Sequence, residues 1–272
     1  MAGEIRRMCI VAQGRSCADD GSAASTRWST PAAVIVTFMT TIDFGRFEAL
    51  TFDCYGTLID WEAGLIAAFE PILAAHGIRE DAQDILERYA RHEAAIEAGP
   101  YLTYRDVLAG GLGGVADELG FKPTSAEVES FSGSVVDWPP FPDSAAALER
   151  LHARYRLGVI TNCDDDFFAA SSRRLGLDFD WVVTAQQARA YKPDPANFQL
   201  AFERIGLPRD RILHVAQSLF HDHAPAKRLG MTTVWIDRRH DRPGFGATPP
   251  AEAQPNATYP DMATFAEAAL SG

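Results

Sequence analysis

Polar residues of four kinds lie at or just after the ends of short apolar segments, and together they could carry out covalent catalysis. They are Asp53, Thr161-Asn162, Lys192, and Gln217-Ser218 with Asp222. A carboxylate, a hydroxyl–amide pair, a lysine and a second acid that converge on one crevice match the needs of catalysis by an aspartate nucleophile. Each has an ordinary structural alternative, such as a helix cap for Asp53 or a solvated loop charge for Lys192. Their ordered placement along the chain favours the catalytic interpretation.

Five apolar segments predict the strands that position these residues. They are Ala49–Phe52, Leu157–Thr161, Trp181–Thr184, Ile212–Ala216 and Thr232–Ile236. Helix-like segments alternate with them: Asp143–Tyr155, Asp165–Leu175, Asn197–Ile205 and His223–Leu229. Strands that are apolar throughout and alternate with helices indicate a parallel sheet covered on both faces. The sequence therefore predicts an α/β fold, in which a surface loop at 242–255 precedes a last short strand and helix.

The residues between Trp61 and about Pro139 are expected to form helices only. The helical segments are Leu65–His76, Ala82–Ile96, Tyr104–Leu119 and Ser125–Val135. Such an insert after the first strand is expected to cover the carboxyl ends of the strands, where open α/β sheets bind ligands. The expected domains are a poorly ordered extension at 1–45, an α/β core at 46–60 and 140–272, and a helical cap at 61–139.

The overall charge limits the class of partner. Lys and Arg number 25 and Asp and Glu 37, which gives a net charge of −12 over 272 residues. Such a surface repels nucleic acid and anionic lipid, and no apolar run approaches the ~20 residues that cross a bilayer. The four cysteines have neither metal-ligand spacing nor the number for a disulfide scaffold, which favours the cytosol. An anionic substrate would need local positive charge in the pocket.

The polar residues lie in four motifs that resemble, in the same order, those of the haloacid dehalogenase superfamily. The motifs are Phe52-Asp53-Cys54-Tyr55-Gly56-Thr57-Leu58, Ile160-Thr161-Asn162, Tyr191-Lys192-Pro193-Asp194 and His214-Val215-Ala216-Gln217-Ser218-Leu219-Phe220-His221-Asp222. The resemblance extends from about Phe47 to the C-terminus. It implies a Rossmann-like parallel-sheet core with an inserted helical cap.

Two positions distinguish between branches of this superfamily. Its phosphatases usually carry a second Asp two residues after the nucleophile and an acid that binds Mg²⁺ at the start of the fourth motif, whereas this chain has Tyr55 and Gln217. Mg²⁺ is held mainly by carboxylates and waters, so Gln217 weakens such a site. A halide departs without a proton, which makes the second Asp dispensable. The chain thus resembles the L-2-haloacid dehalogenases, and the resemblance implies a small 2-haloacid substrate and no metal or organic cofactor.

The resemblance also implies roles for individual residues. Asp53 attacks C2 of the substrate to form an ester, Lys192 pairs with Asp53, and Asp222 positions or deprotonates the water that cleaves the ester. Thr57, Thr161 and Asn162 donate hydrogen bonds to the nucleophile or to the substrate carboxylate. The remaining expected substrate-binding residues are Tyr55, Gln217, Ser218 and, in the cap, Arg88, with Arg91 as its competitor.

Some positions depart from the dehalogenase pattern and leave alternatives open. Leu219 replaces an Asn that helps to hold the water, and Phe198 replaces a Tyr. His221 and His223 either assist the water or are partly exposed loop histidines. The glycine-rich run 110–114 is expected to be a cap loop or a helix break. A Mg²⁺-dependent phosphatase and a non-catalytic binding protein remain rival functions, and the oligomeric state, a homodimer included, stays open.

Overall fold

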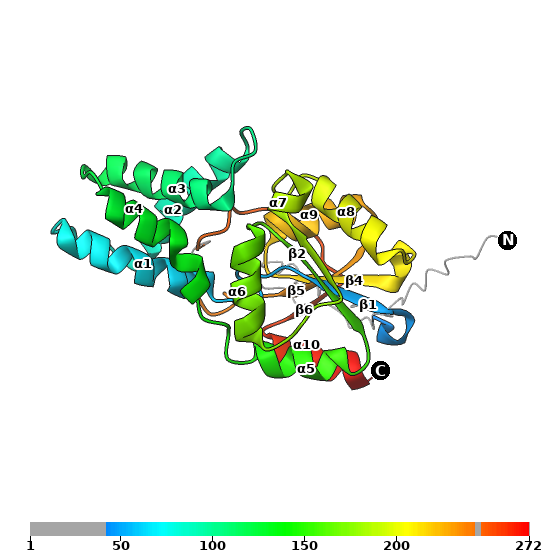
Figure 1. Ribbon diagram of the computed structural model, residues 1–272. Coiled ribbons are helices and arrows are strands. Elements are labelled where there is room, and N and C mark those ends of the chain that lie inside the picture. The colour runs from blue at the N-terminus through cyan, green and yellow to red at the C-terminus, as the bar shows by residue number, and fades with distance from the viewer. Residues whose placement is uncertain (1–41, 243–245, 272) are drawn as a thin grey trace, which may run out of the picture. The chain divides into compact units, whose positions relative to one another are not determined.

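A six-stranded parallel sheet forms the centre of the computed structural model, which describes residues 42–242 and 246–271 (Figure 1). The strands are β1 (Ala49–Phe52), β2 (Arg156–Thr161), β3 (Trp181–Thr184), β4 (Ile212–Ala216), β5 (Thr232–Ile236) and β6 (Ala257–Tyr259), and their order is β3-β2-β1-β4-β5-β6. Phe52, the last residue of β1, pairs with Val159 on β2 and with Val215 on β4. The chain order changes direction at β1, so the residues that follow β1 face a crevice between its neighbours.

Helices cover both faces of this sheet. They are α5 (Ser144–His152), α6 (Asp165–Leu175), α7 (Ala185–Ala188), α8 (Ala196–Ile205), α9 (Ala224–Arg228) and α10 (Met262–Ser271). Alternate strand residues face opposite layers: Val159 packs in the cluster that contains Leu148 of α5, and Ile160 packs with Phe198 of α8. Figure 1 shows α5 and α10 on one side of the sheet and α8 and α9 on the other. The predicted α/β fold is confirmed.

Four helices lie between β1 and α5, where the sequence predicted a helical insert. They are α1 (Trp61–Ala75), α2 (Ala82–Glu97), α3 (Tyr104–Leu119) and α4 (Ser125–Gly133), followed by a 3-10 turn at Ser134–Asp137. Asp60, Asp81, Thr103 and Thr124 cap their N-termini through side-chain oxygens. Of the helices in the described part of the chain, none is long and apolar enough to cross a membrane.

The glycine-rich run 110–114 lies inside the continuous helix α3, so the expected loop or helix break is wrong. A Cβ atom on Gly111 would lie 2.5 Å from the Tyr89 ring, and one on Gly114 would lie 2.3 Å from the His92 ring. These glycines allow α3 to approach α2 closely. The gain in packing between the two helices outweighs the unfavourable helix propensity of glycine.

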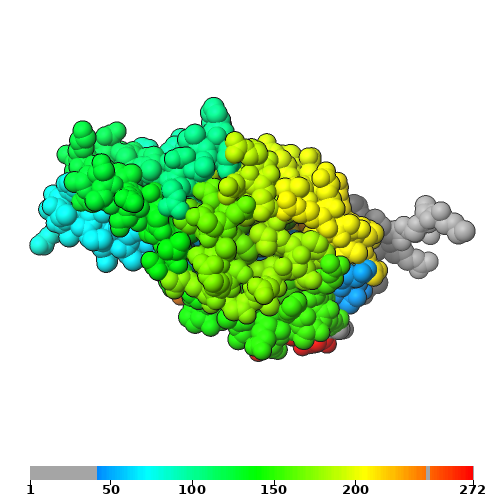
Figure 2. Space-filling model, in the orientation of Figure 1, coloured from blue at the N-terminus to red at the C-terminus, as the bar shows by residue number. Residues whose placement is uncertain are grey.

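Hydrogen bonds join the cap helices to the loops after the strands. The carboxylate of Asp164, just after β2, accepts from the backbone N–H groups of Tyr104 and Arg105 at 3.1 Å each, so it caps α3 from the core. The Tyr191 hydroxyl donates to the Leu102 carbonyl at 3.0 Å. Figure 2 shows this junction as the border between the teal atoms after α2 and the yellow-green atoms near residue 190. These contacts hold the cap against the end of the sheet at which Asp53 lies.

The expected N-terminal extension falls almost entirely on residues 1–41, which lie outside the described residues. Ordered structure nevertheless begins before residue 46: Phe44–Arg46 forms a 3-10 turn, and the Phe44 ring is buried against Phe265 of α10. The burial of this ring places the start of the core a few residues earlier than the sequence indicated.

Candidate active site

Asp53 follows the last residue of β1, and its carboxylate is held by the turn that comes next. Its backbone N–H donates to the Val215 carbonyl of β4 at 3.1 Å, which continues the ladder to the strand tip. Gly56 has a φ of 93°, a conformation that favours glycine, and the turn it permits brings Thr57 back toward Asp53. The Thr57 hydroxyl donates to Asp53 Oδ2 at 2.8 Å and accepts from the Gln217 backbone N–H at 2.8 Å.

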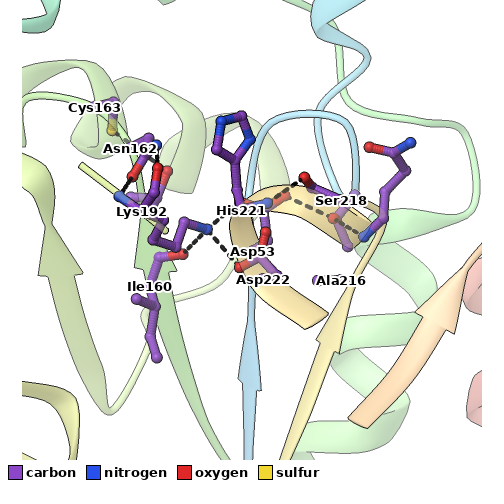
Figure 3. Close-up of polar contacts among 12 residues, drawn as sticks. Asp53, Ile160, Asn162, Cys163, Lys192, Ala216, Ser218, His221 and Asp222 are labelled. Carbon is purple, nitrogen blue, oxygen red and sulfur yellow. Dashed lines mark hydrogen bonds and ion pairs between the residues drawn. The ribbon is translucent and has the colours of Figure 1, made fainter. Parts of the chain in front are cut away.

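Lys192 joins the two acids of the site. Its ammonium donates to Asp53 Oδ1 at 2.8 Å, to Asp222 Oδ1 at 2.7 Å and to the Ile160 carbonyl at 2.8 Å (Figure 3). These three bonds use all three of its N–H donors, and the side chain is only 1% exposed. Asn162 fixes the Lys192 backbone, because its amide accepts from the Lys192 N–H at 2.7 Å and donates to the Lys192 carbonyl at 3.1 Å.

The charges of this cluster support one another. Burial raises the pKa of Asp53, while the Lys192 ammonium and the Thr57 hydroxyl oppose that rise. Burial disfavours the charged form of Lys192, but the two carboxylates outweigh burial and raise its pKa. Burial acts against ionisation of Asp222 as well, and Lys192 together with His214 outweighs it and lowers the Asp222 pKa. Lysine and aspartates therefore form one ionised, hydrogen-bonded unit below the cap.

His214 is a member of this unit that the sequence did not indicate as functional. It lies in the middle of β4, fully buried, and its Nε2 is 3.0 Å from Asp222 Oδ1. Its Nδ1 is 3.0 Å from the Thr51 hydroxyl on β1, and its ring meets the Phe198 ring edge-on at 5.1 Å. A histidine in an otherwise apolar, buried strand was the available signal, because a buried imidazole needs a hydrogen-bond partner.

The acids and Lys192 line a small pocket of about 30 Å³ under the cap. Its lining residues are Asp53, Tyr55, Trp61, Glu93, Glu97, Tyr104, Asn162, Lys192, Ser218, His221, Asp222 and Thr248. A larger cavity of about 530 Å³ shares Glu97, Lys192 and His221 with it. The Asp53 carboxylate thus lines a small pocket that shares residues of the cap with a larger cavity.

Two buried acids form the cap side of the pocket, and the sequence analysis missed both. Glu93 and Glu97 lie one turn apart on α2. The Glu93 carboxyl accepts from the hydroxyls of Tyr89 and Tyr104 at 3.0 Å each, and burial raises its pKa to about 7 in spite of these bonds. Burial and the nearby Glu93 raise the pKa of Glu97 well above its ordinary value.

The structure brings most of the expected site residues together. Asp53, Tyr55, Asn162, Lys192, Ser218 and Asp222 line the pocket, and Thr57 supports Asp53 from behind. The Tyr55 hydroxyl lies 3.0 Å from Ser171 Oγ. The Ser218 hydroxyl accepts from the His221 N–H at 2.9 Å, which begins the turn Leu219–His223 that carries Asp222.

Three expected substrate-binding residues are placed elsewhere. Arg88 does not line the pocket: its guanidinium pairs with Glu118 of α3 on the surface of the cap. The Thr161 hydroxyl is fully buried and points to the Cys163 sulfur at 3.7 Å. The Gln217 side chain lines a separate cavity next to Arg238 and accepts from the Thr248 hydroxyl at 3.4 Å, while its backbone N–H donates to Thr57.

Of the two histidines that flank Asp222, His223 is buried, whereas the His221 side chain is 14% exposed, so the expectation of partly exposed loop histidines is wrong for His223 only. His223 Nε2 lies 2.9 Å from the Ala216 carbonyl. His221 lines the pocket with its Nε2 3.8 Å from Glu97 Oε2. Burial lowers the pKa of each to about 4, so both rings are neutral at pH 7.

The donor set of the pocket does not fit Mg²⁺. The carboxylates of Asp53 and Asp222 are bridged by Lys192, and the amide of Gln217 is turned away from them. Within residues 42–242 and 246–271, no three His, Cys, Asp or Glu side chains are grouped so that they could hold a metal ion. Mg²⁺ requires near-octahedral oxygen ligation, which this pair of acids does not complete.

Comparisons with known proteins agree with this geometry. The chain is 26% identical over 225 residues to the (S)-2-haloacid dehalogenase of Pseudomonas putida, which covers 80% of this chain and 94% of that protein. It is 26% identical over 198 residues to haloacetate dehalogenase H-2 of Moraxella sp. (strain B), covering 71% and 87%. The solved L-2-haloacid dehalogenase from Xanthobacter autotrophicus has the same fold, with a TM-score of 0.69 and 22% identity over 81% of this chain and 97% of that one.

The family model of the haloacid dehalogenase-like hydrolases matches residues 47–230. This range contains the strand tip with Asp53, the helical insert, and the loops that carry Lys192 and Asp222. With the parallel core and these residues in place, the chain belongs to the haloacid dehalogenase-like hydrolase family.

Proposed function

We propose that this protein is a 2-haloacid dehalogenase, which hydrolyses the carbon–halogen bond of short 2-haloalkanoic acids to give 2-hydroxy acids. The observation that carries the proposal is the unit of Asp53, Lys192 and Asp222, in which a buried carboxylate is oriented for attack with no metal ligand set beside it. The names of the curated relatives, two of which are haloacid and haloacetate dehalogenases, support the same substrate class.

In the first step, a carboxylate oxygen of Asp53 attacks C2 of the substrate and the halide leaves with the bonding electron pair. No proton is transferred, because a halide is a stable anion. This agrees with Tyr55 in place of an acid: its hydroxyl is engaged with Ser171, and burial raises its pKa well above the ordinary value. The product is an ester between Asp53 and the 2-hydroxyacyl group, with inverted configuration at C2.

In the second step, water attacks the carboxyl carbon of Asp53. The Lys192 ammonium faces this carboxyl group at 2.8 Å and stabilises the oxyanion that develops there. Asp222 accepts a proton from the water, and its Oδ2 has no hydrogen-bond partner in the described chain. One proton of the water ends on the departing 2-hydroxy acid and one is released, so Asp53 is regenerated with an oxygen from solvent.

A single turnover in ¹⁸O-water with excess enzyme tests this mechanism. We expect halide release from 2-chloropropionate, ¹⁸O in the peptide that contains Asp53, and no ¹⁸O in the 2-hydroxy acid of the first turnover. Halide release with an unlabelled Asp53 and a labelled first product would mean direct attack by water on C2. Phosphate release from phosphate esters, with no halide from any 2-haloacid, would favour the rival phosphatase.

A further inference from the structure

Among the described residues that line the pocket, no cation is available for the carboxylate of a 2-haloacid. Lys192 is the one lysine or arginine among its lining residues, and its three N–H donors are bound to Asp53, Asp222 and the Ile160 carbonyl. Arg189 lines the larger cavity only, where its guanidinium lies 4.3 Å above the Tyr101 ring. Recognition of the substrate carboxylate must therefore come from neutral hydrogen-bond donors.

Glu97 is a polar residue of the cap that lies where it could bind the substrate carboxylate. Its side chain is only 8% exposed and lines both the small pocket and the larger cavity. Glu93, one turn earlier, is satisfied by two tyrosine hydroxyls, whereas Glu97 has no partner within hydrogen-bond distance in the described chain. His221 Nε2 lies 3.8 Å from Glu97 Oε2, beyond hydrogen-bond distance. A buried carboxyl group that faces the reacting acid without a partner points to a ligand that supplies one.

We propose that Glu97 is a substrate-binding residue that remains a neutral carboxylic acid and donates its O–H to the carboxylate of the 2-haloacid. This inference rests on the proposed dehalogenation and specifies how its substrate is recognised. The acid–carboxylate hydrogen bond takes the place of an ion pair. It also adds no positive charge near Asp53, so the nucleophile is not weakened.

The groups around Glu97 favour its neutral form. On its own helix Glu93 lies one turn away, and burial together with Glu93 raises the Glu97 pKa. From the core, Lys192 opposes this rise, but its charge is shared with Asp53 and Asp222. His221 is neutral because burial lowers its pKa to about 4. Glu97 also lies near the hydroxyls of Tyr89, Tyr104 and Tyr191, whose raised pKa values keep them protonated.

This assignment has a consequence for pH dependence. When Glu97 ionises as pH rises, it loses its donor and repels the substrate carboxylate, so KM should rise while kcat changes little. Glutamine keeps an N–H donor of nearly the same shape and does not titrate. Methionine keeps the volume and loses the donor.

The test compares the wild type with Glu97→Gln and Glu97→Met, and uses Glu149→Gln on the exposed face of α5 as the matched control. Halide release from 2-chloropropionate is measured from pH 5 to 10. We expect KM to rise about 10- to 100-fold in Glu97→Met, in line with loss of a hydrogen bond to a charged group, and Glu97→Gln to recover most of this. The rise in KM with pH should be absent in Glu97→Gln and present in the control.

Binding of 2-hydroxypropionate, the expected product, is measured in parallel by calorimetry because it requires no turnover. Loss of halide release in every protein, with product binding that still depends on Glu97, would refute the dehalogenase function and leave the role of Glu97 standing. Equal loss of product binding in Glu97→Gln and Glu97→Met, with unchanged thermal unfolding, would overturn that role. Faster halide release from 2-chloropropionamide than from the acid would also overturn it, while Asp53 chemistry remained intact.

Discussion

Replacement of Glu93 by glutamine should change how the stability of this protein depends on pH. Glu93 is 5% exposed, accepts two tyrosine hydroxyls, and has a pKa raised from 4.5 to about 7 by burial. An acid whose pKa is raised on folding stabilises the protein fully below its unfolded pKa, and this contribution is lost as pH rises through the folded pKa. The relevant window runs from about pH 4.5 to about pH 7.

The size of the effect follows from the shift. One pKa unit corresponds to about 1.4 kcal/mol, so a rise from 4.5 to about 7 gives a loss of about 3 kcal/mol in the free energy of unfolding across the window. Glutamine does not titrate and does not suffer this loss. Its extra N–H donors lack an acceptor, however, which costs about 1–3 kcal/mol at every pH. Glu93→Gln should therefore be less stable than the wild type near pH 4.5, and the gap should narrow or reverse by pH 7.5.

Urea unfolding at intervals between pH 4.5 and 7.5, followed by circular dichroism, measures this difference. Glu149→Gln, an exposed substitution of the same type, is the control and should run parallel to the wild type. Equal m-values among the three proteins are required before the free energies are compared. A gap between Glu93→Gln and the wild type that stays constant or widens toward pH 7.5 would refute a Glu93 pKa raised by burial to about 7.

Three further predictions concern the catalytic unit. Lys192→Met should lower kcat for halide release by about 100- to 1000-fold, because it removes the ammonium from Asp53 and Asp222. A loss in kcat of less than tenfold would contradict the role of Lys192 in stabilising the oxyanion. His214→Phe should lower kcat about 10- to 100-fold with little change in KM, because Asp222 loses a hydrogen-bond donor. His214→Gln should recover part of the rate. A change in KM alone would indicate that His214 has a different function. Halide release should survive treatment with EDTA and should not increase with added Mg²⁺, because the Gln217 side chain is turned away from Asp53 and Asp222. Loss of activity on treatment with EDTA would favour the phosphatase function.

The core and the meeting of Asp53, Lys192 and Asp222 could be predicted because few arrangements satisfy their sequence pattern. Ala49–Phe52 is apolar at every position but Thr51, and such a segment favours burial on both faces and therefore a central parallel strand. Asp53 comes directly after this strand, and Asn162 comes directly after its neighbour, so parallel pairing alone brings them to the same edge. Local pattern and global fold indicate the same answer at these positions.

The contacts that cross between elements were harder to predict. In the sequence, His214 is one polar residue in an apolar strand. Nothing in β4 itself predicts that Asp222, eight residues later, lies within hydrogen-bond distance of it. Gly111 and Gly114 read as helix breakers, although the side chains that need the space lie on another helix. In both cases the deciding partner lies in another part of the chain and meets the residue only in the folded protein, so tertiary packing overrides the local preference.

The assignment of the cap residue failed for a reason that helix geometry makes plain. Successive residues on an α-helix are rotated by about 100°, so Arg88 and Glu93 point roughly 140° apart and cannot both face the pocket. Leu86, Tyr89, Glu93 and Glu97 follow the spacing of a single face, and the buried positions at its start show that this face is the inner one. The signal in the sequence was the pair of acids, Glu93 and Glu97, at the end of this otherwise apolar stripe. Because acids are buried only where something compensates them, this stripe identifies the inner face of a cap helix more reliably than a search for an arginine does.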